Sequence, residues 1–189
     1  MDPIELLMDE HRTIERVMDA LDACVDPRNP GAAQADLAGF VTFLRDFADL
    51  RHHGKEEDIL FAAMIDNGFP RDAGPIAVML GDHDEGRSHV RALAALASAD
   101  APWTAGQRAS VTTHARAFTA LLRAHIQKED QILYPMALRH LPEGAMSEVT
   151  RRFGEFEAGP AAARCRTDLY ALASSLSNRS FNPSVGKEI

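Results

Sequence analysis

HHGKEEDILF at residues 52–61 and HIQKEDQILY at residues 125–134 are two versions of one motif, 73 residues apart. In both versions a His is followed by Lys three positions later, Glu four positions later and then Ile-Leu-aromatic. Because a turn of α-helix takes about 3.6 residues, the His and the Glu of each copy lie on one helical face. The repeat therefore predicts two copies of one helical unit.

The repeat also includes the helices that precede the two motifs. Asp9-Glu10-His11 matches Gly81-Asp82-His83 at an offset of 72 residues. Apolar residues at three- and four-residue steps predict amphipathic helices, and segments rich in Pro and Gly separate them. No segment shows the sustained alternation of a β-strand. The predicted helices cover about residues 4–21, 33–65, 75–97 and 107–141.

Short loops between four long helices predict an all-α protein, an up-down-up-down four-helix bundle with an additional C-terminal helix. We expect the bundle in residues 1–142, a C-terminal helical extension in 143–176 and a frayed polar tail in 177–189. Pro135 should bend or interrupt the last turns of the fourth helix.

The C-terminal extension is interrupted at Gly159-Pro160. Its apolar residues could cover one flank of the bundle or form a homodimer contact. Its charged residues are expected to form a solvated face. The apolar residues are Phe153, Phe156, Leu169, Tyr170, Leu172 and Leu176, and the charged ones are Arg151, Arg152, Glu155 and Glu157.

Composition excludes several classes of protein. The net charge of −8 argues against a general nucleic-acid partner or an anionic membrane surface. Cys24 and Cys165 form no Cys-x-x-Cys pair, so a disulfide scaffold is not expected. The N-terminus lacks a signal-peptide pattern, and no apolar run reaches membrane-spanning length. We therefore expect a cytoplasmic protein.

Equivalent residues of a pseudo-symmetric bundle meet near its axis, and here those residues have side chains that can bind metal ions. Imidazole with carboxylate suits Fe, Mn or Zn, and carboxylates from facing helices can bridge two metal ions. The absence of Cys from the set argues against an iron–sulfur cluster or a structural zinc site. The predicted ligands are His11, His52, Glu56, His83, His125 and Glu129.

Neighbouring residues offer alternatives. Chance placement of the eight His and twelve Glu gives about half of one His-x-x-x-Glu match, whereas the chain has four. The alignment of the repeat favours His52/Glu56. His53/Glu57 is the alternative pair, rotated by about 100° around an α-helix. His11/Glu15 is the fourth match, and because the repeat places Arg87 opposite Glu15, a ligand role for Glu15 lacks support.

These motifs resemble the hemerythrin-like family, also called the HHE cation-binding domain, over about residues 4–141. The matching segments are Glu10-His11, the two repeated motifs, Gly74-Pro75-Ile76, Asp82-His83-Asp84-x-Gly86-Arg87 and Pro135. The resemblance implies two non-haem iron ions in an oxo- or hydroxo-bridged centre. It implies His11, His52, His83 and His125 as terminal ligands, with Glu56 and Glu129 as bridges.

One departure from the family pattern affects the expected ligand set. Oxygen-carrying hemerythrins have His-x-x-x-His on the third helix, whereas here Arg87 follows His83 by four residues. A missing His would open a position to water, O2, NO or a nearby side chain. We place His89, His114 and His140 outside the site. Tyr134, opposite Phe61 in the repeat, is expected mainly to pack.

The leading functional hypothesis is a diiron protein that binds or senses O2, NO or peroxide, or that reports iron or redox state. The alternative is a diiron enzyme or an iron-donating protein of the peroxide or NO stress response. A third hypothesis is that the protein is a metal-free bundle whose last helix binds a partner.

Overall fold

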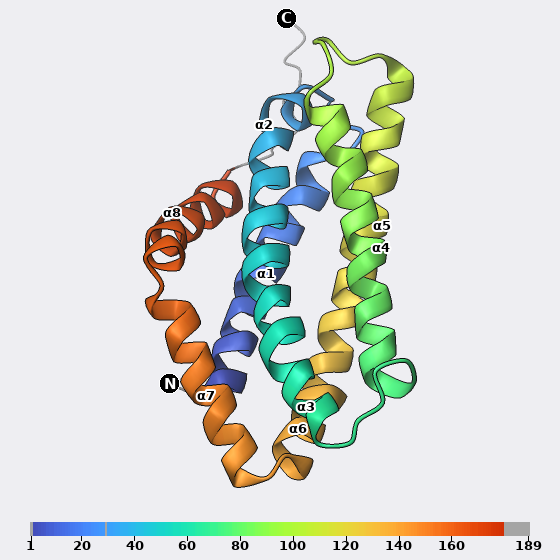
Figure 1. Cartoon of the computed structure of the whole chain (residues 1–189). Helices are drawn as coiled ribbons and strands as arrows, with labels where there is room; N and C mark the ends of the chain where they lie inside the picture. The colour runs from blue at the N-terminus through green and yellow to red at the C-terminus, as the bar shows by residue number, and fades with distance from the viewer. Residues whose placement is uncertain (1, 29, 180–189) are drawn as a thin grey trace, which may run out of the picture.

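The structure is a computed structural model that describes residues 2–28 and 30–179, and no strand occurs among these residues. The all-α prediction is therefore confirmed. Figure 1 shows the helices. In chain order they are α1 (Pro3–Cys24), α2 (Pro30–Phe43), η1 (Leu44–His53), η2 (Glu56–Phe61), α3 (Ala62–Asp66), α4 (Gly74–Ala97), α5 (Ala105–Lys128), η3 (Glu129–Leu133), α6 (Tyr134–His140), α7 (Glu143–Ala158) and α8 (Pro160–Ser177).

Most of these helices join into four long helical columns that lie side by side (Figure 1). The first is α1, the second runs from α2 to α3, the third is α4, and the fourth runs from α5 to α6. α4 packs against α2 and α5, and α1 packs against the same two helices, so the columns close into a ring. The first and last residues of each column are within a few positions of those of one predicted helix.

Local sequence signals account for two of the helix starts. The Asp2 side chain accepts hydrogen bonds from the backbone N–H groups of Ile4 and Glu5. Thr104 and Gln107 form a reciprocal capping box at the start of α5. These bonds satisfy N–H groups that the helix itself leaves without partners.

The segments η1, η2 and η3 are π-helical, with hydrogen bonds that span five residues instead of four. η2 and η3 lie within the two repeated motifs, and η1 ends at the first two residues of the first motif. Pro135 follows η3 directly in the first turn of α6, where its missing N–H costs little. The hydrogen-bond pattern of the column thus changes next to Pro135, and the column continues to His140.

Two apolar clusters fill the interior and leave a polar layer between them. The first cluster includes Ile14, Ala48, Val90 and Leu122, one from each column. The second includes Leu7, Ile59, Met79 and Leu133, again one from each column. In every column, the predicted metal ligands lie between these positions in the sequence. Apolar layers on both sides therefore shield them from water.

The C-terminal extension lies along one flank of the columns (Figure 1). α7 packs against α1, η2 and α3, and α8 packs against α1 and α2. Phe153, Leu169 and Leu176 are buried by this packing. The apolar face of the extension thus covers a flank of the four columns, one of its two expected roles.

The charged residues of α7 do not all behave as the sequence predicts. Arg151 and Glu155 are exposed, as expected of a solvated face. Glu157 is buried, and the expectation that it is solvated was wrong. Residues two apart on an α-helix point about 200° apart, so only one of Glu155 and Glu157 can face the bundle.

α8 ends at Ser177, and the predicted tail beyond residue 179 lies outside the described residues. Among residues 2–28 and 30–179, no helix combines the length and apolar character that a membrane span requires.

Candidate metal centre

All six predicted ligands meet in the polar layer between the two apolar clusters, and one further histidine, His53, joins them. Each of the seven residues comes from one of the four columns and is at most 4% exposed. They are His11 from α1, His52, His53 and Glu56 from the second column, His83 from α4, and His125 and Glu129 from the fourth column.

Potential ligand atoms fall into two groups, and within each group they lie within 4.8 Å of one another. The first group comprises His11, His52, Glu56 and Glu129. Here His11 Nε2 is 3.3 Å from Glu129 Oε2, and His52 Nε2 is 3.6 Å from Glu56 Oε1. Two imidazoles and two carboxylates thus face one small volume.

The second group comprises His53, Glu56, His83 and His125. His83 Nε2 lies 3.5 Å from Glu56 Oε2 and 3.1 Å from His125 Nε2. Glu129 Oε2 is also only 3.1 Å from His125 Nε2. Glu56 belongs to both groups, and Glu129 contacts a histidine of each, so both carboxylates lie where bridging ligands would be required.

His53 is the residue that sequence reasoning treated as an alternative and that the structure adds. The sequence offered His52/Glu56 and His53/Glu57 as competing pairs, because successive residues of an α-helix point about 100° apart. η1 ends at His53 and is π-helical, and its wider turn brings successive side chains closer in direction. Both imidazoles therefore enter the cluster, whereas Glu57 does not.

His53 places an additional imidazole next to His83. The His53 ring stacks on the His83 ring at 3.8 Å between centroids. The second column thus supplies an imidazole beside His83, whereas α4 has Arg87 four residues after it. The only sequence signal for this was the adjacent His pair itself.

Each imidazole also faces a carboxylate on its outer side, through Nδ1. The distances are 2.7 Å for His11 to Asp130, 2.9 Å for His52 to Glu10, 2.7 Å for His83 to Glu57, 3.2 Å for His125 to Asp82 and 3.6 Å for His53 to Asp49. In the first four pairs the carboxylate can accept the Nδ1 proton, which fixes the ring and leaves Nε2 free to bind a metal. Asp49 is too far from His53 for such a hydrogen bond. Glu57, which the sequence offered as an alternative ligand, thus orients His83 instead.

A cation lies behind each outer carboxylate. Arg51 and Lys55 contact Glu10, Arg87 contacts Asp49 and Glu57, Lys128 contacts Asp82, and Arg12 contacts Asp130. The series Lys55–Glu10–His52 has its counterpart in Lys128–Asp82–His125, at the offsets of the sequence repeat. The repeat therefore preserves the groups that orient the imidazoles as well as the imidazoles themselves.

Tyr134 differs from its repeat partner Phe61. Its hydroxyl donates a hydrogen bond to Glu56 and lies 3.3 Å from His11 Nε2. Its ring is fully buried and stacks on His11 at 5.6 Å between centroids. Phe61 has no hydroxyl, and its ring stacks on the His83 ring with 5.9 Å between centroids. The expectation that Tyr134 mainly packs therefore missed a polar role inside the site.

The remaining histidines and Glu15 lie outside the cluster, as the sequence suggested. His89 and His114 contact each other between α4 and α5, with their Nδ1 atoms 3.1 Å apart. His140 lies against Phe69, with 6.1 Å between ring centroids. Glu15 forms a partly exposed ion pair with Arg12 at 3.0 Å.

Burial and the charges of neighbouring side chains shift the pKa values of several residues in the cluster. Burial, reinforced by repulsion from His83, lowers the pKa of His53 to about 3. Burial and the charge of Glu129 raise the pKa of Glu56 well above its usual range. Burial also opposes ionisation of Glu129, but His125 and His11 outweigh it and hold the pKa of Glu129 well below its usual range. Burial opposes protonation of His125, but Glu129 and Asp82 outweigh it and raise the pKa of His125 to about 9.

Several buried atoms of the cluster have no hydrogen-bond partner. They are both ring nitrogens of His53, Oε2 of Glu56 and both carboxylate oxygens of Glu129. Unpaired buried polar atoms and carboxylates are costly, and coordination of a cation removes that cost. The chemistry and burial of this donor set therefore fit divalent metal ions such as iron.

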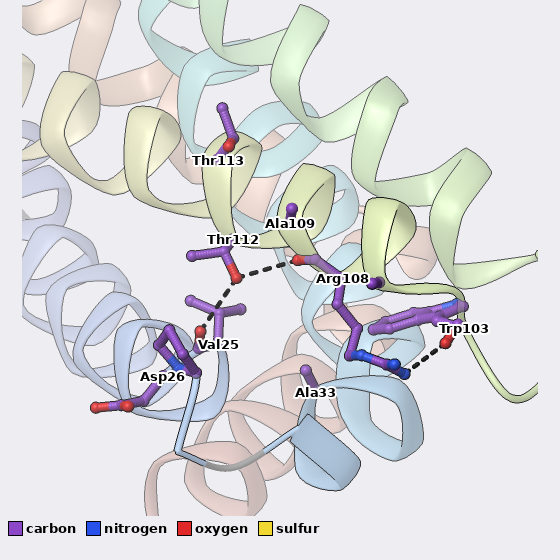
Figure 2. A pocket seen from close by; sticks show the side chains of 10 residues that line it. Val25, Asp26, Ala33, Trp103, Arg108, Ala109, Thr112 and Thr113 are labelled. Carbon is purple, nitrogen blue, oxygen red and sulfur yellow. Dashed lines mark hydrogen bonds between the residues drawn. The ribbon is translucent and has the colours of Figure 1, made fainter.

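Two of the cavities formed by the described residues show which side of the columns reaches the cluster. One, of about 160 Å³, leads between α2–η1 and α4 to His53, and its wall is mainly apolar, with Leu44, Val90 and Phe118. The other, of about 480 Å³, lies near Trp103 and Val25 (Figure 2), where Thr112 donates a hydrogen bond to the Val25 carbonyl at 3.3 Å. Val25 is fourteen residues beyond His11, about 20 Å along α1, so this second cavity does not reach the cluster.

The fold and the site define an all-helical protein with a buried histidine–carboxylate cluster suited to cations. The family model described as "Hemerythrin HHE cation binding domain" matches residues 2–137. The chain belongs to this family, as the resemblance of its motifs suggested. No curated protein and no solved structure matches the chain.

Proposed function

We propose that the chain is a non-haem diiron protein that binds or senses O2, with NO or peroxide as related ligands. The observation that carries this proposal is the sharing of Glu56 between two buried groups of ligand atoms. We further propose that the four columns form the up-down-up-down bundle of the hemerythrin family, spanning residues 1–142, with residues 143–176 as an added extension.

In this proposal the histidines divide unequally between the two ions. His11 and His52 would hold one ion, His53, His83 and His125 would hold the other, and Glu56 and Glu129 are the carboxylates that could serve both. The ion with two histidines would have fewer protein ligands and therefore room for an external molecule. The six ligands expected from the sequence, with His53 added, stay a prediction until metal binding is measured.

Two ferrous ions would supply the two electrons that reversible binding of O2 requires. The residues of the chain would orient the ligands and exclude water. The outer carboxylates hold the imidazoles in place through Nδ1, and the apolar layers keep water away. The Tyr134 hydroxyl holds Glu56 by a hydrogen bond.

The test is anaerobic loading with Fe(II), removal of unbound metal and then exposure to air. We expect about two iron ions per chain and the near-ultraviolet bands of an oxo-bridged diferric centre. The double variant Glu56→Ala/Glu129→Ala should lose most of the iron, whereas Glu15→Ala, a partly exposed control outside the cluster, should retain it. Less than half an iron per wild-type chain would refute the proposal, and so would unchanged iron in the double variant.

Catalysis is the second candidate, and Tyr134 favours it. A buried phenol that contacts both Glu56 and His11 could supply a proton during reduction of peroxide or NO. Turnover of either compound by the loaded protein would support an enzyme, whereas reversible binding without turnover would support a carrier or sensor. Transfer of iron to an apo-protein acceptor would support an iron donor.

Two further expectations stay predictions. A homodimer through the C-terminal helix would have to use its outer face, because Leu169 and Leu176 are buried within the chain. A cytoplasmic location rests on the sequence pattern alone.

A further inference from the structure

A network of four buried charges connects the C-terminal extension to the candidate metal centre. Glu157 of α7 accepts hydrogen bonds from Arg51 and, at 3.0 Å, from Lys55. Lys55 also donates to one oxygen of Glu10, and the other oxygen of Glu10 lies 2.9 Å from His52 Nδ1. The exposed fraction of these four charged side chains is 0% for Glu10 and Lys55, 5% for Arg51 and 7% for Glu157.

This network is present on one side of the pseudo-symmetric site only. On the other side, Lys128 contacts Asp82, which faces His125, and Lys128 is 36% exposed. Water can therefore solvate Lys128, whereas Lys55 has no access to water. At the offset of the repeat, Arg51 corresponds to Ala124. The second cation and its α7 partner thus have no counterpart in the other half.

Glu157 lies outside the part of the chain that the family model matches, which ends at residue 137. The extension nevertheless contributes more than one contact here. The rings of Phe153 and Phe156 lie 5.9 and 5.8 Å from Lys55 Nζ. The extension therefore encloses Lys55 with a carboxylate and two aromatic faces, which suits a buried cation.

Loss of the Glu157 charge would leave two buried cations to share one carboxylate. Arg51 Nε is already 3.4 Å from the same Glu10 oxygen that accepts from Lys55. Both cations would then draw on Glu10, which would hold His52 less firmly. The surplus positive charge would also lie close to the volume where cations bind, and it would weaken their binding.

We propose that Glu157 is a positioning residue of the metal centre, through which the C-terminal extension sets the iron affinity on the His52 side. Glu157 bonds to Lys55 and Arg51, and it acts by keeping these two cations from drawing Glu10 away from His52. This inference rests on the proposed function, because it requires that the cluster bind iron.

The experiment is an anaerobic Fe(II) competition titration of the full chain, with the spectrum after air exposure as a second readout. Glu157→Gln should bind iron roughly tenfold more weakly, the lower end of the effect of losing a group that orients a ligand. Its diferric spectrum should change as well. Glu155→Gln is the matched control, since Glu155 is on the same helix, is exposed and pairs only with exposed Arg151 among the described residues.

The outcomes separate the inference from the proposed function. Wild-type iron affinity and spectrum in Glu157→Gln would overturn the inference, even with a lowered melting temperature, because α7 would then have only a structural role. If Glu157→Gln does not fold, Glu157→Asp decides: a several-fold loss of affinity supports the inference, and wild-type affinity overturns it. A wild-type chain that binds no iron would overturn both the inference and the proposed function.

Discussion

His53 shows how the backbone decides the chemistry of a single side chain. Its two ring nitrogens are buried and have no hydrogen-bond partner, although Asp49 lies 3.6 Å from Nδ1. Its burial favours the neutral imidazole, which is the form that binds a metal. An unpartnered neutral ring beside His83 and His125 contributes little to the fold by hydrogen bonding. The burial of the His53 ring is therefore better explained by metal binding than by a contribution to the stability of the fold.

We predict that His53→Ala lowers the iron content from about two ions per chain toward one. The variant leaves the second group with His83 and His125 as its only histidines, whereas the first group keeps all of its atoms. Iron analysis after anaerobic loading and desalting would measure the change. His89→Ala is the control, because His89 contacts His114 and lies outside the cluster. Equal iron in the two variants would show that His53 is not a ligand.

At the scale of helices, the sequence predicted the positions of the long helices, because these depend on local periodicity. Apolar spacing and loop composition located the four columns, and the repeat identified six residues that do meet. The sequence could not predict the π-helical hydrogen bonds of η1, because they are not tied to a residue preference, and these bonds bring His53 into the cluster. Nor could it distinguish Glu157 from Glu155, because α7 lies outside the repeat and packing decides which face is buried.

The packing of α8 on α2 gives a prediction about glycine. A Cβ on Gly39 of α2 would lie 3.3 Å from Leu176 Cδ2 of α8, whereas a Cβ on Gly81 of α4 would meet nothing within 4 Å. Gly81→Ala should therefore raise the free energy of unfolding by about 0.5–1 kcal/mol through helix propensity. Gly39→Ala should gain less, because Leu176 must shift. Urea denaturation would measure both, and equal gains would argue against this docking of α8.

At the scale of the whole molecule, the candidate centre joins all four columns. α1, the second column, α4 and the fourth column each contribute at least one side chain to it. The polar layer also separates two apolar clusters that would otherwise pack continuously. Without a metal, the interior holds carboxylates and imidazoles whose desolvation opposes folding. Metal bound at this position would hold together segments that are far apart in the sequence.

Iron should therefore stabilise the entire fold. A ligand that binds only the native state at 100 times its Kd adds about 2.7 kcal/mol, and in a chain of this size each kcal/mol raises Tm by roughly 2–4 °C. We expect the loaded protein to melt at least about 5 °C above the metal-free protein in anaerobic calorimetry. Glu56→Ala/Glu129→Ala should show no such difference, because both shared carboxylates are absent. Equal melting temperatures for loaded and metal-free wild-type protein would instead favour a bundle whose buried histidines serve no metal.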